Sequence, residues 1–134
     1  MILRLSGLYL ILDPSIAGSR SLTDIVQTAL DAGVRFFQLR MKTLETGKLH
    51  EMASVLCPLV QKSGGTFIVN DRVDVAKAVG ADGVHLGQED LPLVDARAIL
   101  GPGRLIGIST HNLVQATEAE AGGADYIGFG PIFP

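Results

Sequence analysis

Short apolar segments alternate with longer stretches of helical periodicity along the whole chain, and this alternation most narrows the possible folds. Six such segments occur, at residues 7–12, 34–39, 66–69, 83–86, 105–108 and 126–129. Each is apolar at consecutive positions, which is typical of strands buried on both faces of a parallel sheet. The stretches between them have the length of helices, so the pattern predicts repeated βαβ units with right-handed crossovers.

The expected helices lie at residues 22–32, 48–62, 73–79, 93–100 and 113–121. In the first of them Leu22, Val26 and Leu30 fall on one stripe, as in an amphipathic helix that covers a sheet. Pro58 lies inside the second, and we expect it to kink that helix.

Glycine recurs at regular intervals in this pattern. Gly33, Gly80 and Gly123 each lie between an expected helix and a strand, 47 and 43 residues apart, which is about two βα units per step. Such a period indicates a barrel or solenoid of equal parts. The 134 residues provide about five βα units and a sixth strand, whereas a (β/α)₈ barrel needs at least about 200 residues. Length therefore favours an open doubly wound sheet, and the repeat favours a barrel.

Composition excludes several classes of protein. Eleven basic residues stand against fourteen acidic ones, a net charge of −3, and nucleic-acid binding usually needs a concentrated basic patch. No apolar run approaches the roughly 20 residues of a membrane span. A single cysteine, Cys57, excludes an internal disulfide and a cysteine-only metal site. We expect a cytoplasmic protein without nucleic-acid or membrane partners.

The second apolar segment runs into a polar end that contains Gln38, Arg40 and Lys42. Side chains alternate along an extended strand, so these three would project in the same direction if the strand continued. An amide and two cations suit a polyanion such as a phosphate group. The alternative is a pair of ordinary solvated surface cations.

Two carboxylates follow the third and fourth segments. Taken singly, Asp71 resembles a helix N-cap and Asp90 a turn or cap residue. Neighbouring strands lie about 4.8 Å apart, however, so the two loops can converge on one point. Two carboxylates without histidine or cysteine suit Mg²⁺, which also binds phosphate oxygens. Together with Arg40 and Lys42, they predict a magnesium-dependent diphosphate site.

The fifth segment ends in a serine, a threonine and a histidine. Ser109 offers a hydrogen bond to a phosphate, or else belongs to a turn before a helix that begins at Asn112. His111 can titrate near neutral pH, and we expect His85 to be a packed, hydrogen-bonded core residue. The chain has no Walker loop, no G-x-G-x-x-G after a strand and no G-x-S-x-G turn.

Five segments together resemble the thiamine-phosphate synthase family, in family order. They are YLILD, FFQLRMK, FIVNDRVDVAKAVGADGVHLGQEDLP, IGISTH and ADYIGFGPIFP. The resemblance implies an α/β fold of the TIM (β/α)₈-barrel type. Of that barrel, residues 1–134 would form a single incomplete domain with about the first five βα units and the sixth strand.

The resemblance also implies an activity in thiamine biosynthesis. Family members are Mg²⁺-dependent transferases that join 4-amino-5-hydroxymethyl-2-methylpyrimidine diphosphate to a thiazole phosphate, giving thiamine phosphate and pyrophosphate. The reaction is dissociative: pyrophosphate leaves first, and the thiazole nitrogen captures the pyrimidine-methyl cation. Such a reaction needs charge neutralisation on the leaving group rather than a protein nucleophile.

Individual roles follow from the same resemblance. The positions that match the family's pyrimidine diphosphate site are Gln38, Arg40, Lys42, Asn70 and Ser109, and those that match its magnesium ligands are Asp71 and Asp90. Within these, the catalytic set that neutralises the leaving group would be Arg40, Lys42 and Ser109.

The chain departs from the family pattern after GPIFP, where it stops at Pro134. Family members continue with a threonine-rich loop and two more βα units, which contact the thiazole phosphate. We therefore expect a fragment with bare strand edges, homo-oligomers formed through those edges, and little turnover. Two alternatives stay open: a thiazole tautomerase that uses His111 as its base, and a non-catalytic phosphate-ligand-binding protein on a flavodoxin-like sheet, whose strand order would reverse in the middle.

Overall fold

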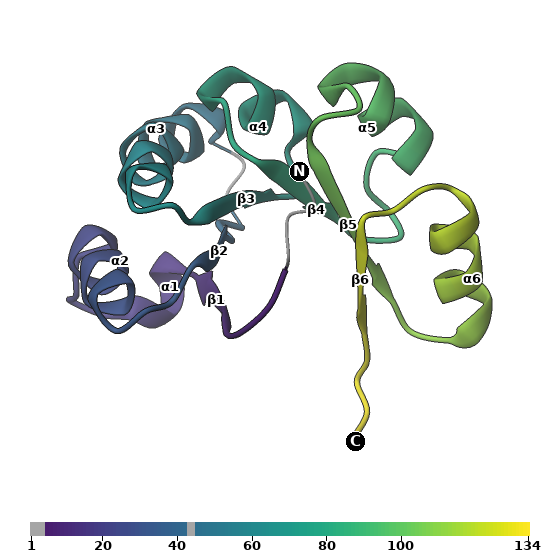
Figure 1. Ribbon diagram of the computed structural model, residues 1–134, viewed down its shortest axis with the longest axis horizontal. Coiled ribbons are helices and arrows are strands. Elements are labelled where there is room, and N and C mark those ends of the chain that lie inside the picture. Colours follow the sequence, from purple (N-terminus) through teal and green to yellow (C-terminus); the bar gives the residue numbers. More distant parts are fainter. Residues whose placement is uncertain (1–4, 43–44) are drawn as a thin grey trace.

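The computed structural model describes residues 5–42 and 45–134, and within them six parallel strands form one sheet (Figure 1). The strands are β1 (Tyr9–Leu12), β2 (Phe36–Leu39), β3 (Thr66–Asn70), β4 (Gly83–Leu86), β5 (Leu105–Thr110) and β6 (Tyr126–Phe129). The helices are α1 (Pro14–Ala17), α2 (Leu22–Asp31), α3 (Thr46–Lys62), α4 (Val73–Val79), α5 (Leu93–Leu100) and α6 (Leu113–Ala121).

Strand order separates the two architectures that the sequence left open. The strands lie side by side in chain order from β1 to β6, and every neighbouring pair is parallel. In Figure 1 the helices form an arc around the outside of the sheet. A flavodoxin-like sheet would reverse its order in the middle, so that alternative is wrong. The fold is a half-barrel of the TIM type.

Most predicted helices have the observed bounds, because their ends carry local signals. The bounds of α4, α5 and α6 are as predicted. Asn112 caps α6 by accepting a hydrogen bond from the Gln115 backbone N–H at 2.9 Å. α3 begins two residues earlier than expected and continues through Pro58 to Lys62. The four-residue helix α1 was not predicted, since one turn is too short to show a helical period.

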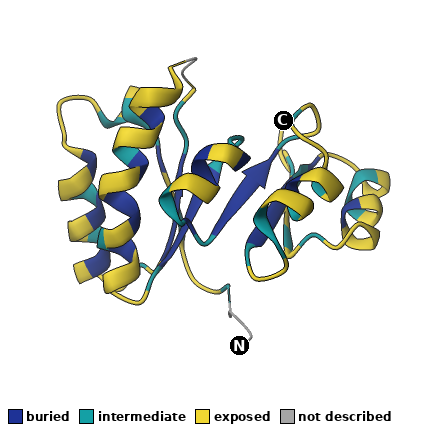
Figure 2. Cartoon of the chain, turned by 90° about the horizontal axis from the view of Figure 1, so that it is seen from above, coloured by how far each residue is buried: buried dark blue, intermediate teal, exposed yellow. Residues whose placement is uncertain are grey.

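The two faces of the sheet bury different sets of side chains. Residues such as Phe37, Val69 and Ile106 point outward, where they pack against the helices in the main apolar core. The inward residues form a second, smaller cluster around Phe36 and Ile68. Figure 2 shows the buried residues in the strands and on the sides of the helices that face them. The alternation of a strand therefore separates the core from the barrel interior.

The prediction that every strand is buried on both faces is confirmed for the central strands and wrong at the edges. All four residues of β2 and of β4 are buried. Among the described residues, β1 and β6 each have a neighbouring strand on one side only, and Ile127 and Phe129 of β6 are 41% and 48% exposed. None of the helices in residues 5–42 and 45–134 has the length and apolarity of a membrane span.

The glycine repeat has a structural counterpart. Gly33, Gly80 and Gly123 follow α2, α4 and α6 with φ of 94°, 69° and 85°. These are left-handed conformations that glycine adopts without a Cβ clash. The predicted step of two βα units is confirmed.

An aspartate completes this turn in two of the three repeats. The carboxylate of Asp82, just before β4, accepts a hydrogen bond from the Phe67 N–H of β3 at 2.8 Å. The carboxylate of Asp125, just before β6, accepts one from the Ile106 N–H of β5, also at 2.8 Å. We call Asp82 and Asp125 the strand-start carboxylates. Each ties the beginning of a strand to the strand before it.

Candidate active site at the carboxyl ends of the strands

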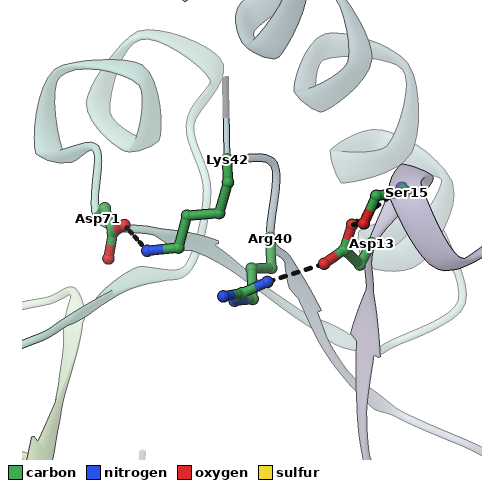
Figure 3. Close-up of polar contacts among 5 residues, drawn as sticks. All are labelled: Asp13, Ser15, Arg40, Lys42 and Asp71. Carbon is green, nitrogen blue, oxygen red and sulfur yellow. Dashed lines mark hydrogen bonds and ion pairs between the residues drawn. The ribbon is translucent and has the colours of Figure 1, made fainter. Parts of the chain in front are cut away.

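Because the strands are parallel, their carboxyl ends all lie at one end of the half-barrel, where α/β folds bind ligands. We call five of the charged residues that follow β1 to β4 the mouth cluster: Asp13, Arg40, Lys42, Asp71 and Asp90. Figure 3 shows four of them together with Ser15. Two cations face three carboxylates, so the cluster has a formal charge of −1.

Asp71 has an unusual backbone. Its φ is 65°, and it is the one non-glycine residue with a positive φ in the described part of the chain. Its N–H donates to the carbonyl of His85 at 2.8 Å. α4 begins after Arg72 without a side-chain cap, so the N-cap interpretation of Asp71 is wrong. A left-handed aspartate costs about 1 kcal/mol, and such strain is concentrated at functional sites.

The Asp71 carboxylate faces a cation and a second carboxylate. Lys42 Nζ lies 2.8 Å from Asp71 Oδ2, and both side chains are partly exposed. Burial raises the pKa of Asp90, the neighbouring Asp71 charge raises it further, and Lys42 opposes the rise. Asp71 and Asp90 are therefore close enough for the charge of one to change the pKa of the other. One carboxylate oxygen of Asp90 has the turn role that the sequence indicated, because it accepts a hydrogen bond from the Gly87 N–H at 2.7 Å.

Arg40 pairs with a residue that sequence reasoning missed. Arg40 Nη1 lies 2.8 Å from Oδ2 of Asp13, the residue directly after β1. Hydrogen bonds from Ser15, assisted by the Arg40 charge, hold the pKa of Asp13 below its usual range. The signal was present in the sequence, since Asp13 follows its strand as Asp71 follows β3.

Gln38, Arg40 and Lys42 do not share one direction as predicted. β2 ends at Leu39, so strand alternation does not extend to Arg40 and Lys42. Those two turn to carboxylates on opposite sides, Asp13 after β1 and Asp71 after β3 (Figure 3). Gln38 lies deeper and is only 4% exposed.

Below the mouth cluster, a chain of hydrogen bonds crosses the barrel interior. Gln38 Nε2 donates to Tyr9 Oη at 2.7 Å, and the hydroxyls of Tyr9 and Tyr126 lie 2.8 Å apart. His85 joins Tyr126 Oη through Nδ1 at 3.1 Å and Ser109 Oγ through Nε2 at 2.8 Å. Both tyrosines were missed, although their positions on β1 and β6 place them on the inward face.

The hydrogen bonds inside the half-barrel decide how His85 and Ser109 are to be interpreted. His85 is buried and hydrogen-bonded as predicted, and burial lowers its pKa. Ser109 lies within β5 with its hydroxyl against His85, so the interpretation of Ser109 as a turn residue is wrong. Asn70 ends β3, half-buried and in register with His85. His111 is exposed beyond β5, with Nδ1 2.7 Å from the carbonyl oxygen of Gly130.

The chemistry of the mouth cluster suits a hard divalent cation. Across residues 5–42 and 45–134, no group of three or more His, Cys, Asp or Glu side chains is placed to hold a metal. Asp71 and Asp90 provide two carboxylates, and Mg²⁺ is typically held by one or two carboxylates with water and phosphate oxygens in the other positions. Burial and the neighbouring Asp71 raise the pKa of Asp90, and a divalent cation between two such carboxylates would offset their mutual repulsion. These residues fit the ion.

Comparisons with known proteins match nearly the whole chain. A family model described as "Thiamine monophosphate synthase" matches residues 8–134. A putative thiamine-phosphate synthase of Geobacter sulfurreducens is 50% identical over 128 residues, which cover 96% of this chain and 60% of that protein. The thiamine-phosphate synthase of Shouchella clausii is 49% identical over 127 residues, covering 95% and 61%.

A solved structure has the same fold. Thiamine phosphate pyrophosphorylase from Pyrococcus furiosus superposes with a TM-score of 0.84 at 40% sequence identity, covering 94% of this chain and 60% of that one. The chain thus spans about 60% of the length of the relatives it matches.

Proposed function

The chain belongs to the thiamine monophosphate synthase family, and from this premise we propose that its mouth cluster binds a pyrimidine-methyl diphosphate with Mg²⁺ for the synthesis of thiamine phosphate. The second substrate is a thiazole phosphate, and the products are thiamine phosphate and pyrophosphate. The observation that carries the proposal is the meeting of Asp71, Asp90 and Lys42 at the ends of three neighbouring strands.

Asp71 and Asp90 hold the metal in this proposal. Mg²⁺ supplies positive charge to the diphosphate oxygens, which makes pyrophosphate a better leaving group. Asp71 has a left-handed backbone where it follows β3, and the Gly87 N–H orients one oxygen of Asp90.

Arg40 and Lys42 bind the diphosphate directly. Their side chains are 42% and 58% exposed, so both are accessible to a ligand. As the bond between the pyrimidine methylene carbon and the diphosphate oxygen breaks, its electron pair stays on pyrophosphate. Two cations near that oxygen stabilise the charge that develops. The thiazole nitrogen then forms the new bond to the methylene carbon with its lone pair.

Gln38, Asn70 and Ser109 complete the proposed substrate set from inside the half-barrel. Ser109 and Gln38 are each held by a neighbour, His85 and Tyr9 respectively, so their hydrogen-bonding atoms have fixed directions. Ser109 donates to the diphosphate, and the two amides contact the substrate. Groups fixed in this way bind with less loss of side-chain entropy.

Titration of the 134-residue chain with pyrophosphate tests the proposal. In isothermal titration calorimetry we expect binding with excess Mg²⁺ and none with a chelator, because the cluster alone has a negative charge. Asp90→Asn should weaken the binding by at least about tenfold. The control Asp74→Asn, exposed and paired with Arg72, should bind like the wild type. Equal binding with and without Mg²⁺ would contradict the proposal.

Three further expectations stay predictions. They are a single domain over residues 1–134, a cytoplasmic location, and self-association through the exposed edges of β1 and β6. We also expect little or no thiamine phosphate formation by these 134 residues, since they match about 60% of each relative.

A further inference from the structure

Asp13 and Arg40 form an ion pair in which one partner is nearly buried and the other reaches into solvent. The Asp13 side chain is 8% exposed and that of Arg40 is 42% exposed, with Asp13 Oδ2 and Arg40 Nη1 2.8 Å apart. A long, exposed arginine ordinarily samples many rotamers. Here its tip is tied to a carboxylate that belongs to a different strand end.

Asp13 is fixed independently of Arg40. Its Oδ1 accepts hydrogen bonds from the Ser15 backbone N–H at 2.9 Å and from Ser15 Oγ at 2.6 Å. Its carbonyl oxygen accepts the N–H groups of Ile16 and Ala17, the last two residues of α1, each at 3.1 Å. Pro14 sets the backbone at the first position of that helix. The carboxylate therefore has one orientation, with Oδ2 left for Arg40.

The pair leaves most of the guanidinium group available. Arg40 uses Nη1 for Asp13, and a guanidinium has five N–H donors in a planar fork. Figure 3 shows the other Arg40 nitrogen atoms turned away from Asp13, on the side of the Lys42 ammonium group. Donors arranged in this way can meet two oxygens of one phosphate group.

We propose that Asp13 is a positioning residue, which holds Arg40 so that its remaining N–H donors face the diphosphate beside Lys42. The inference rests on the proposed function, because it takes the diphosphate as the ligand of Arg40. Asp13 does not bind that ligand. Its own negative charge would repel a diphosphate, so any benefit to binding must pass through Arg40.

The two possible roles of Asp13 predict opposite effects of its substitution on ligand affinity. If only the charge of Asp13 mattered, Asp13→Asn would tighten the binding of an anion. If Asp13 positions Arg40, the same substitution weakens binding, since Arg40 must then be immobilised by the ligand itself. The entropy lost in ordering one such side chain lowers the affinity by about three- to tenfold.

The experiment is a double-mutant cycle on the 134-residue chain, with magnesium pyrophosphate as the probe in calorimetry. We expect Asp13→Asn to weaken binding by about three- to tenfold, and to cause no further loss of affinity in an Arg40→Gln background. Ser15→Ala, which loosens Asp13 without changing charge, should weaken binding about twofold. Asp24→Asn, an exposed residue of α2, is the matched control for charge and should leave binding unchanged. Thermal melts of every variant establish that each is folded.

A second readout follows Arg40 without any ligand. Nuclear magnetic resonance of the ¹⁵N-labelled guanidinium should show restricted rotation in the wild type and free rotation in Asp13→Asn. Tighter or unchanged binding by Asp13→Asn, or an equal loss in both backgrounds, overturns the inference and leaves the proposed function standing. Failure of the wild type to bind magnesium pyrophosphate overturns the proposed function, and the inference with it.

Discussion

Aspartate side chains have different roles at the two ends of the half-barrel. At the amino ends of the strands, Asp82 and Asp125 accept backbone N–H groups from the preceding strand. At the carboxyl ends, Asp71 and Asp90 lie beside each other and Lys42. The carboxylates before β4 and β6 are occupied by the fold, whereas the proposed function assigns Asp71 and Asp90, which follow β3 and β4, to a ligand.

The arginines differ between the two ends in the same way. Arg97, near the amino ends, donates to the carbonyl oxygens of Gly101, Arg104 and Gly123 and pairs with Asp125 at 2.7 Å. Arg40, at the mouth, pairs with Asp13 through one nitrogen. Substitutions at the two ends should therefore separate stability from ligand binding.

Asp71→Asn should give the largest effect on binding. Loss of one of two metal-holding carboxylates should weaken magnesium pyrophosphate binding by about 100-fold in calorimetry. Asparagine tolerates the left-handed backbone, so the free energy of unfolding should change by less than about 0.5 kcal/mol. If Asp71→Asn binds magnesium pyrophosphate like the wild type, or is much less stable than it, the carboxyl ends of the strands are not specialised for binding.

Asp125→Ala should show the opposite behaviour. The Ile106 N–H loses its side-chain acceptor and Arg97 loses its ion-pair partner, which together should destabilise the chain by about 1–3 kcal/mol in urea denaturation. Binding of magnesium pyrophosphate should be unchanged at temperatures where the variant is folded. Asp95→Ala, exposed on α5, is the control and should leave stability within about 0.5 kcal/mol of the wild type.

His85 should give the smallest effect, through the pH dependence of stability. Burial lowers its pKa in the folded state, so the unfolded chain binds a proton more readily. Stability should therefore fall as the pH drops below about 6.5, the ordinary histidine value, and be retained above it.

The measurement is the free energy of unfolding between pH 5 and 8 for the wild type, His85→Gln and the exposed control His50→Gln. We expect His85→Gln to have a flatter profile below pH 6.5 and His50→Gln to follow the wild type. If the free energy of unfolding depends on pH in the same way in all three proteins, protonation of His85 does not contribute to the pH dependence of stability.

Local signals in the sequence account for much of the fold. The helix that Asn112 caps and the turns at Gly33, Gly80 and Gly123 depend on residues within a few positions of each other, and the structure has them as predicted. The exposure of β6 depends instead on whether another strand lies beside it, which an apolar segment does not encode.

The site was predicted less completely, for a related reason. Asp71 and Asp90 were paired because they follow neighbouring strands, and the structure brings them together. Asp13 was missed although it directly follows β1, because its partner Arg40 lies 27 residues away, after β2. Tyr9 and Tyr126 are 117 residues apart, and only the three-dimensional curvature of the sheet makes them neighbours.

The strand-start carboxylates also bear on how the polypeptide is made. Asp82 and Asp125 each join a new strand to the one synthesised just before it, so β4 and β6 can each be fixed in place soon after they leave the ribosome. The hydroxyl contact between Tyr9 and Tyr126 requires both ends of the sheet, so it forms last. Translation from the amino terminus thus matches the order in which this architecture can be assembled.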